Sequence, residues 1–158
     1  MRELKIIQNV IDREGGLVND PDDKGGLTKY GITKRFFPWI DIENLTKAEA
    51  VDIYKEHYWD KYRVNKIPED LQSDYFDAMV NLGRRGAGRV AQEAINSTRG
   101  KRLKVDGIVG PNTMKEIHRI NASRFKAYRI LRYAKIVMSD KTQSKFYYGW
   151  FNRTMEVE

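Results

Sequence analysis

The sequence contains no cysteine, which excludes disulfide bonds, thiolate catalysis and cysteine-based zinc sites. Its two histidines, His57 and His118, stand alone and lack the spacing of metal ligands, so we expect neither a metal nor a cofactor. No apolar run approaches the length of a membrane span, and the serines lack the surroundings of a nucleophile elbow. The first residues alternate charged and apolar types and do not resemble a signal peptide. These absences leave a globular protein that is stabilised by its apolar core.

The 158 residues fit one domain, and the formal charge of +7 is unevenly distributed along it. Residues 1–83 carry a net charge of −4, whereas residues 84–158 carry +11. This division suggests chemistry in the first half and attraction to a polyanion in the second. No nucleic-acid recognition motif accompanies the basic residues, so we expect nonspecific attraction to anionic wall polymers or lipid headgroups and no specific nucleic-acid partner. The basic face is predicted to contain Arg84, Arg85, Arg89, Lys101, Arg102 and Lys104.

The apolar pattern predicts a mainly α fold with a short glycine-rich loop or β-hairpin after the first helix. We expect helices over residues 2–14, 46–62, 71–82, 87–97, 112–120 and 122–138, and around residues 146–151. The second should begin with a capping box at Thr46 and Glu49. Gly83 and residues 86–88 are expected to interrupt the helical structure between two helices. Asn112 is expected to cap the helix that follows it.

Residues 14–33 combine five glycines with four acidic residues. Glu14 is predicted to lie at the C-terminal end of the first helix, where the helix dipole disfavours a negative charge. Three aspartates, at positions 20, 22 and 23, and Thr28 follow in a loop shaped by glycine and proline. Two carboxyl groups in unlike settings are what glycosidic bond cleavage requires. From the residues alone, a catalytic Glu14 and an ordinary exposed glutamate are equally supported.

The same stretch closely resembles the signature of the bacterial and phage muramidases of glycoside hydrolase family 108. Further similar segments lie along nearly the whole chain, at residues 45–60, 76–83, 106–113 and 149–153. The resemblance implies a lysozyme-like helical fold. It also implies hydrolysis of the bond between N-acetylmuramic acid and N-acetylglucosamine in peptidoglycan. A lytic transglycosylase and a non-catalytic protein that binds the wall or assists secretion are the alternatives.

The resemblance assigns the role of catalytic acid to Glu14. Asp23 and Thr28 are spaced similarly to the second and third residues of the Glu, Asp, Thr triad of T-even phage lysozymes, but Thr28 is one position closer to Asp23 than in that pattern. Asp20 or Asp22 therefore stays an alternative for the second carboxylate. The residues expected to bind substrate are Asn19, Asp20, Tyr30, Trp59, Asp77 and Asn81.

Asp77 and Asn81 lie four positions apart on an otherwise apolar helix, so they must be hydrogen-bonded or open to a cleft. We expect them to line the groove and to position the substrate or the loop.

Residues 106–111 are similar to peptidoglycan-binding modules, although Asp-Gly and Gly-Pro are also ordinary turn signals. We expect the turn to be their first role and wall binding to be their second. The single domain would then have a catalytic lobe over residues 1–85 and a basic helical lobe over residues 86–158. We expect a monomer that is made in the cytoplasm and reaches peptidoglycan glycan strands through holin-type or dedicated release, as a phage endolysin does.

Overall fold

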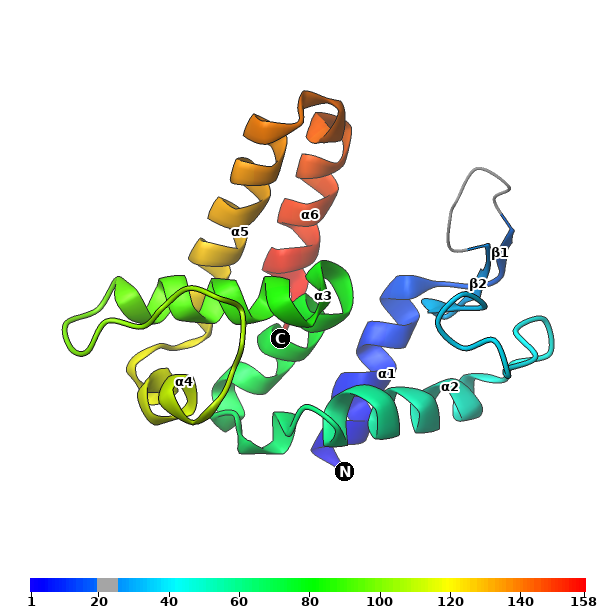
Figure 1. Ribbon diagram of the computed structural model, residues 1–158. Helices are drawn as coiled ribbons and strands as arrows, with labels where there is room; N and C mark the ends of the chain where they lie inside the picture. Colours follow the sequence, from blue (N-terminus) through cyan, green and yellow to red (C-terminus); the bar gives the residue numbers. More distant parts are fainter. Residues whose placement is uncertain (20–25) are drawn as a thin grey trace. The chain divides into compact units, whose positions relative to one another are not determined.

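A computed structural model describes residues 1–19 and 26–158 of the chain. The chain is mainly helical, as expected, and carries a small antiparallel sheet (Figure 1). It divides into two units, Met1–Arg63 and Val64–Glu158, each of which is described here by itself.

The first unit begins with α1, Arg2–Glu14, as its apolar pattern predicts. Ile6, Ile7, Val10 and Ile11 form one buried stripe on this helix. Gly15 follows with a φ of 79°, a conformation that ends a helix and that glycine adopts without strain. The helix therefore ends with Glu14 as its last residue.

The expected hairpin is present after α1. Strands β1 (Val18–Asn19), β2 (Leu27–Lys29) and β3 (Ile32–Thr33) form an antiparallel sheet in that order. Lys29 pairs with Ile32, so β2 and β3 are joined by the two residues Tyr30 and Gly31. Both have positive φ, 55° and 75°, which is the requirement of a type I′ hairpin turn.

Helix α2, Lys47–Tyr54, begins with the predicted capping box. The Glu49 amide donates to the Thr46 hydroxyl at 3.2 Å, and the Thr46 amide donates to the Glu49 carboxylate at 2.8 Å. The helix packs against α1 and continues into a π-helical turn, η1, over Lys55–Asp60. Its buried residues are Ala50, Val51 and Tyr54.

The second unit is built around α3, Gln72–Asn96, which follows the short turns η2 (Val64–Lys66) and η3 (Glu69–Leu71). The expected break occurs only at Gly83, whose φ of 77° and ψ of 161° kink the helix. The prediction that residues 86–88 also break the helix is wrong, because they are helical. Gly88 is small for another reason: a Cβ there would collide with the carbonyl group of Gly107.

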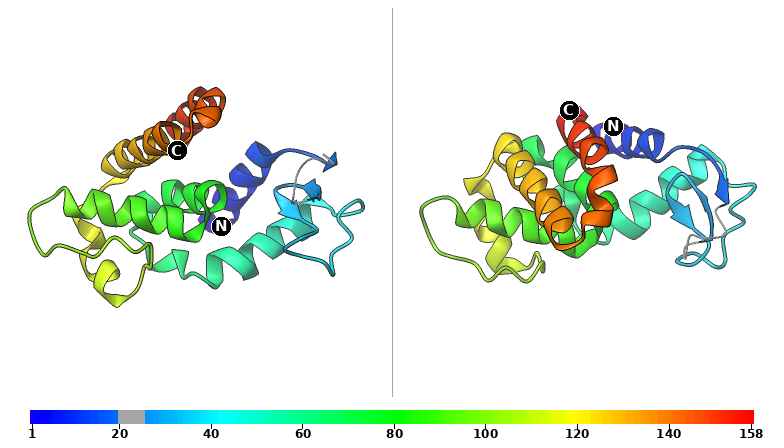
Figure 2. Two further views of the ribbon diagram at one scale, coloured as in Figure 1. Left: turned by 45° about the horizontal axis from the view of Figure 1, so that its top comes forward. Right: turned by 90° about the horizontal axis from the view of Figure 1, so that it is seen from above.

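The remaining helices of the second unit are α4 (Pro111–Glu116), η4 (Ile117–Arg119), α5 (Ala122–Ser139), η5 (Lys141–Gln143) and α6 (Ser144–Glu156). The expected cap at Asn112 is wrong, because Gly110 takes that position and Pro111 begins α4. Helices α5 and α6 lie side by side, and α5 also packs on α3 (Figures 1 and 2). In the described part of the chain, no helix has both the length and the apolar character needed to cross a membrane.

Replacing Gly88 with alanine should lower the free energy of unfolding by about 1–3 kcal/mol, because the new methyl group overlaps backbone that cannot move aside easily. Gly149 is the matched control, since it lies in α6 and a methyl group there would meet no atom within 4 Å. Gly149→Ala should raise the free energy of unfolding by about 0.5–1 kcal/mol. Urea denaturation followed by circular dichroism measures both, and equal effects of the two substitutions would contradict the close approach at Gly88.

Candidate active site

Glu14 is held where α1 meets the hairpin turn. The Tyr30 amide donates to the carbonyl of Gly15 at 3.0 Å, and the Tyr54 hydroxyl donates to the carbonyl of Tyr30 at 2.9 Å. A Cβ on Gly31 would lie 2.9 Å from Cγ of Glu14 and 2.5 Å from the Tyr54 hydroxyl oxygen. The turn therefore lies directly against the Glu14 side chain, and only glycine fits at position 31.

Two tyrosines, Tyr54 and Tyr58, lie near the half-buried Glu14 side chain. The rings of Tyr54 and Tyr58 have centroids 5.2 Å apart. Burial raises the pKa of Tyr58, and the nearby Tyr62 and Glu14 raise it further. Glu14 is thus close enough to the Tyr58 phenol for their charges to interact. Neither tyrosine is predicted by the sequence motifs to lie near Glu14, although their i,i+4 spacing on one helical face was an available signal.

Thr28 lies on β2, in the same hairpin as Tyr30. It pairs with Val18 on one side and with Thr33 on the other, and its hydroxyl donates to the carbonyl of Gly26 at 3.3 Å. Asn19 lies exposed on β1 opposite Leu27. The hairpin therefore brings Thr28 into the same small sheet as Asn19 and connects it, through Tyr30, to the end of α1. Asp20, Asp22 and Asp23 lie outside the described residues.

The two aromatic candidates differ in exposure. Tyr30 is half-buried, and the ammonium group of Lys29 lies 5.7 Å from its ring centroid. Trp59, in η1, is only 2% exposed, which argues against a platform for sugar stacking. Trp39 was missed and is 67% exposed, and it lines a pocket together with Asn44 and Asp52. An indole whose exposed face adjoins polar side chains offers the surface that a sugar ring requires.

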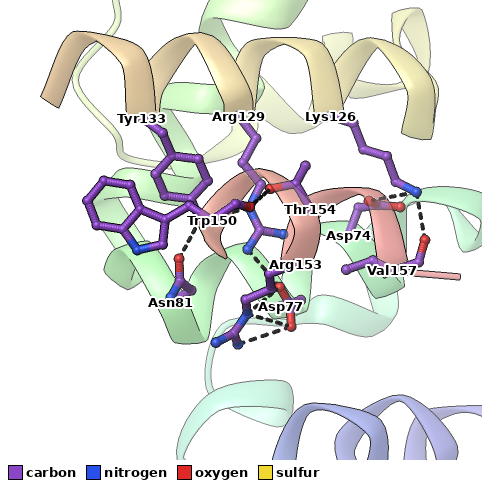
Figure 3. A network of polar contacts seen from close by, with 10 residues as sticks. All are labelled: Asp74, Asp77, Asn81, Lys126, Arg129, Tyr133, Trp150, Arg153, Thr154 and Val157. Carbon is purple, nitrogen blue, oxygen red and sulfur yellow. Dashed lines mark hydrogen bonds and ion pairs between the residues drawn. The ribbon is translucent and has the colours of Figure 1, made fainter. Parts of the chain in front are cut away.

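Asp77 and Asn81 belong to a polar network in the second unit (Figure 3). Arg129 donates to the Asp77 carboxylate at 2.7 Å, and Arg153 donates to both of its oxygens at 3.1 Å. Tyr133 donates to Asn81 and accepts a hydrogen bond from Arg129. Of the two alternatives stated for these residues, hydrogen bonding is the one observed.

The environment of Asp77 is that of a structural carboxylate. It has no exposed surface, which argues against direct contact with a sugar. Burial alone would raise the pKa of Asp77, but the hydrogen bonds from Arg153 and the charges of Arg129 and Arg153 outweigh burial and lower it. Asp77 is therefore ionised and holds α3, α5 and α6 together.

The segment of residues 106–113 is folded around a buried side chain that sequence analysis missed, Gln92 of α3. Its amide nitrogen donates to the Asp106 carboxylate and to the Ile108 carbonyl, both at 3.0 Å. Its oxygen accepts from the Gly107 amide at 2.8 Å. The Ile108 amide also donates to Asp106 at 2.9 Å, which closes the turn. The expected turn is thus present. A lone glutamine in a helix gives no sequence signal for this long-range role.

The described geometry places the Glu14 side chain against the hairpin turn at Gly31, where the Tyr54 hydroxyl group also lies. Within residues 1–19 and 26–158, no three acidic or histidine side chains gather as metal ligands would. The arrangement in the first unit is suited to proton transfer by Glu14 to a bound substrate.

Comparison with known proteins connects both halves of the chain with peptidoglycan. Residues 7–83 match the family described as Glycosyl hydrolase 108, and residues 86–155 match the family described as Predicted Peptidoglycan domain. The resemblance inferred from the sequence motifs is confirmed by these matches. They support a protein that acts on or binds peptidoglycan. No curated protein matches the chain.

Among solved structures, the chain is similar to that of Brucella abortus SagA. The two are 28% identical, with a TM-score of 0.77, over 98% of this chain and 90% of that one. The similarity therefore extends over both units of the chain.

Asp74 provides a test of the electrostatics of the second unit. Burial raises its pKa to about 6 from an ordinary value of 3.8, although Lys126 lies 3.8 Å away and opposes this shift. The folded state thus retains a proton on Asp74 that the unfolded chain releases at lower pH, so the contribution of Asp74 to stability should fall as the pH rises from about 4 to 6. In the Asp74→Asn variant, the free energy of unfolding should decrease by about 1–3 kcal/mol less between pH 4 and pH 7 than in the unmodified protein. Urea denaturation at pH 4 and pH 7 measures it.

The matched control is Asp70→Asn, because Asp70 is exposed in η3. It should leave the difference in stability between pH 4 and pH 7 as it is in the unmodified protein. An Asp74→Asn variant with that same difference would contradict a raised pKa at Asp74.

Proposed function

We propose that the protein is an endo-acting muramidase that hydrolyses the bond between N-acetylmuramic acid and N-acetylglucosamine in peptidoglycan. The observation that carries the proposal is the position of Glu14, which is fixed by the hairpin turn within the segment that matches Glycosyl hydrolase 108. Glu14 is the general acid in this mechanism.

The reaction needs a proton donor on one side of the glycosidic bond. Glu14 transfers its proton to the bridging oxygen as the bond from that oxygen to the anomeric carbon breaks. Positive charge then develops on the sugar ring. A water molecule supplies the hydroxyl group that completes the product, and its proton restores the acid. The fixed side chain of Glu14 supports this role because a general acid must lie within hydrogen-bond reach of the leaving oxygen.

A second carboxylate completes the mechanism. Asp23 is our first choice for stabilising the developing charge or activating water, with Asp20 and Asp22 as alternatives. Thr28 is proposed to orient the water, which its place in the hairpin beside Tyr30 supports. We propose that Asn19, Asp20 and Tyr30 contact the sugar.

Peptidoglycan lies outside the cytoplasmic membrane, so this function requires a route to the wall. Release by a holin, as for a phage endolysin, and a dedicated secretion system are both compatible with the proposal.

Glu14→Gln should reduce the rate of peptidoglycan lysis at least about a hundredfold, because an amide cannot donate the proton that a carboxylic acid supplies. The shape of the side chain is kept, so the melting temperature should stay close to that of the unmodified protein. Glu56→Gln is the control, since Glu56 is an exposed glutamate of η1 in the same unit. Turbidity of a suspension of purified peptidoglycan measures the rate, and undiminished lysis by Glu14→Gln rules out the assignment.

The products distinguish a muramidase from its two rivals. Hydrolysis adds water to each cleaved bond, so mass spectrometry of the released muropeptides should show reducing ends that are heavier, by one water molecule, than the anhydro ends that a lytic transglycosylase makes. A non-catalytic wall-binding protein would sediment with the peptidoglycan and release no fragments. Anhydro ends, or no soluble products, would refute hydrolysis.

A further inference from the structure

The second unit contains a pocket of about 300 Å³ between α3 and the loop that leads to α4. Its lining includes three basic residues, Lys101, Arg102 and Lys104, together with Asp106 and Asn112. This pocket belongs to the segment that matches the Predicted Peptidoglycan domain, residues 86–155. Neither the family match nor the similar solved structure assigns a ligand to it.

The loop that bears the basic residues is fixed to α3 by the side-chain amides of Asn96 and Gln92. The Asn96 side chain donates to the Leu103 carbonyl at 2.8 Å, and the Leu103 amide donates back to Asn96 at 2.7 Å. Leu103 lies between Arg102 and Lys104 and is itself buried. Farther along the loop, Gln92 holds Gly107 and Ile108. The wall of the pocket is therefore organised before a ligand binds, which reduces the entropy lost on binding.

In the described part of the chain, the charged groups of the three basic side chains are not used in ion pairs; Lys104 and Lys101 act only at longer range, where they help to lower the pKa of Asp106 and of Glu116. All are exposed, and among the described residues none forms an ion pair or donates a hydrogen bond from its charged group. Arg119 in the same unit differs, since it pairs with Glu116 at 2.8 Å. Three unpaired cations beside a cavity favour an anionic ligand.

The chemistry of peptidoglycan identifies the anion. Its N-acetylated sugars carry no charge once the lactyl carboxyl is amidated by the peptide stem. The peptide stems carry free carboxylates. A basic pocket can therefore gain charge complementarity from the peptide and not from the glycan. We propose that Lys101, Arg102 and Lys104 bind the carboxylates of the peptide stem, an assignment that rests on the proposed action on peptidoglycan.

The test uses a soluble synthetic stem pentapeptide and the full chain. Titration followed by nuclear magnetic resonance gives the dissociation constant. A variant with Lys101→Gln, Arg102→Gln and Lys104→Gln should bind the peptide about tenfold more weakly at low salt, since exposed charge pairs contribute little individually but add over three sites. Its melting temperature should be unchanged because all three side chains are exposed.

A matched variant carries Lys115→Gln, Lys141→Gln and Lys145→Gln, which remove the same charge from positions outside the pocket. It should bind within about twofold of the unmodified protein. Equal weakening in both variants would show a nonspecific effect of net charge and would overturn the proposal. Equal affinity for a pentapeptide whose carboxyl groups are all amidated would also overturn it.

Two further probes separate other anions. Binding of inorganic phosphate or of a short DNA duplex that depends on the three residues, with no binding of the peptide, would replace the proposal with a phosphate site. The result is independent of Glu14: Glu14→Gln should bind the peptide as the unmodified protein does. If the protein proves not to hydrolyse peptidoglycan, the peptide titration still tests the pocket. If the peptide does not bind, the lysis assay still tests hydrolysis.

Discussion

The hydrogen bond from the Tyr30 amide to the Gly15 carbonyl joins the end of α1 to the β-hairpin. The last carbonyl groups of a helix have no partner inside it, so the hairpin satisfies one that would otherwise need water. Tyr30 has a φ of 55°, which costs a residue with a side chain about 1–3 kcal/mol. The hydrogen bonds at its amide and carbonyl offset that strain. The position of the Glu14 side chain thus depends on a turn that begins sixteen residues later in the sequence.

In the second unit, the corresponding constraint is the buried group of Asp77, Arg129 and Arg153. Moving such charges out of water costs several kcal/mol for each ion, and good geometry must recover it. Here both carboxylate oxygens accept hydrogen bonds from guanidinium groups. The net stabilisation from such a group is small, but its specificity is large. A shift of α5 or α6 by one turn would leave Asp77 buried without its partners, so the network selects a single packing of three helices.

Local patterns predicted the features that depend on neighbours in sequence. The stripe on α1, the Thr46 capping box and the hairpin around Gly31 are all confirmed. The predictions failed where a residue's contacts are distant in the sequence. The prediction of a helix break at residues 86–88 was wrong because the contact of Gly88 with Gly107 is not visible in the sequence. Asp77 was predicted to line a groove because its hydrogen-bond partners, 52 and 76 residues away, cannot be recognised from the sequence.

In the candidate site, too, the residues with local sequence signals could be predicted and those that depend on tertiary packing could not. Glu14 could be placed at a helix end because the helix and the following glycines are local signals. Tyr54 and Tyr58 near it, and the exposed Trp39, could be recognised only from the tertiary packing. A residue type alone does not distinguish a buried tryptophan such as Trp59 from an exposed one.

The charge of the second half of the chain shows why a sum over the sequence is an incomplete description of a binding surface. Arg119, Arg129 and Arg153 are paired with carboxylates inside the unit, and they contribute little to the field outside it. The cations that a partner meets are those left after these pairs are made. Around the loop between α3 and α4, they adjoin a cavity whose wall is fixed by hydrogen-bonded amides. The combination of unpaired charge and a rigid cavity, more than the net charge, is what makes selective binding possible there, because diffuse positive charge attracts every polyanion and a shaped site can discriminate among them.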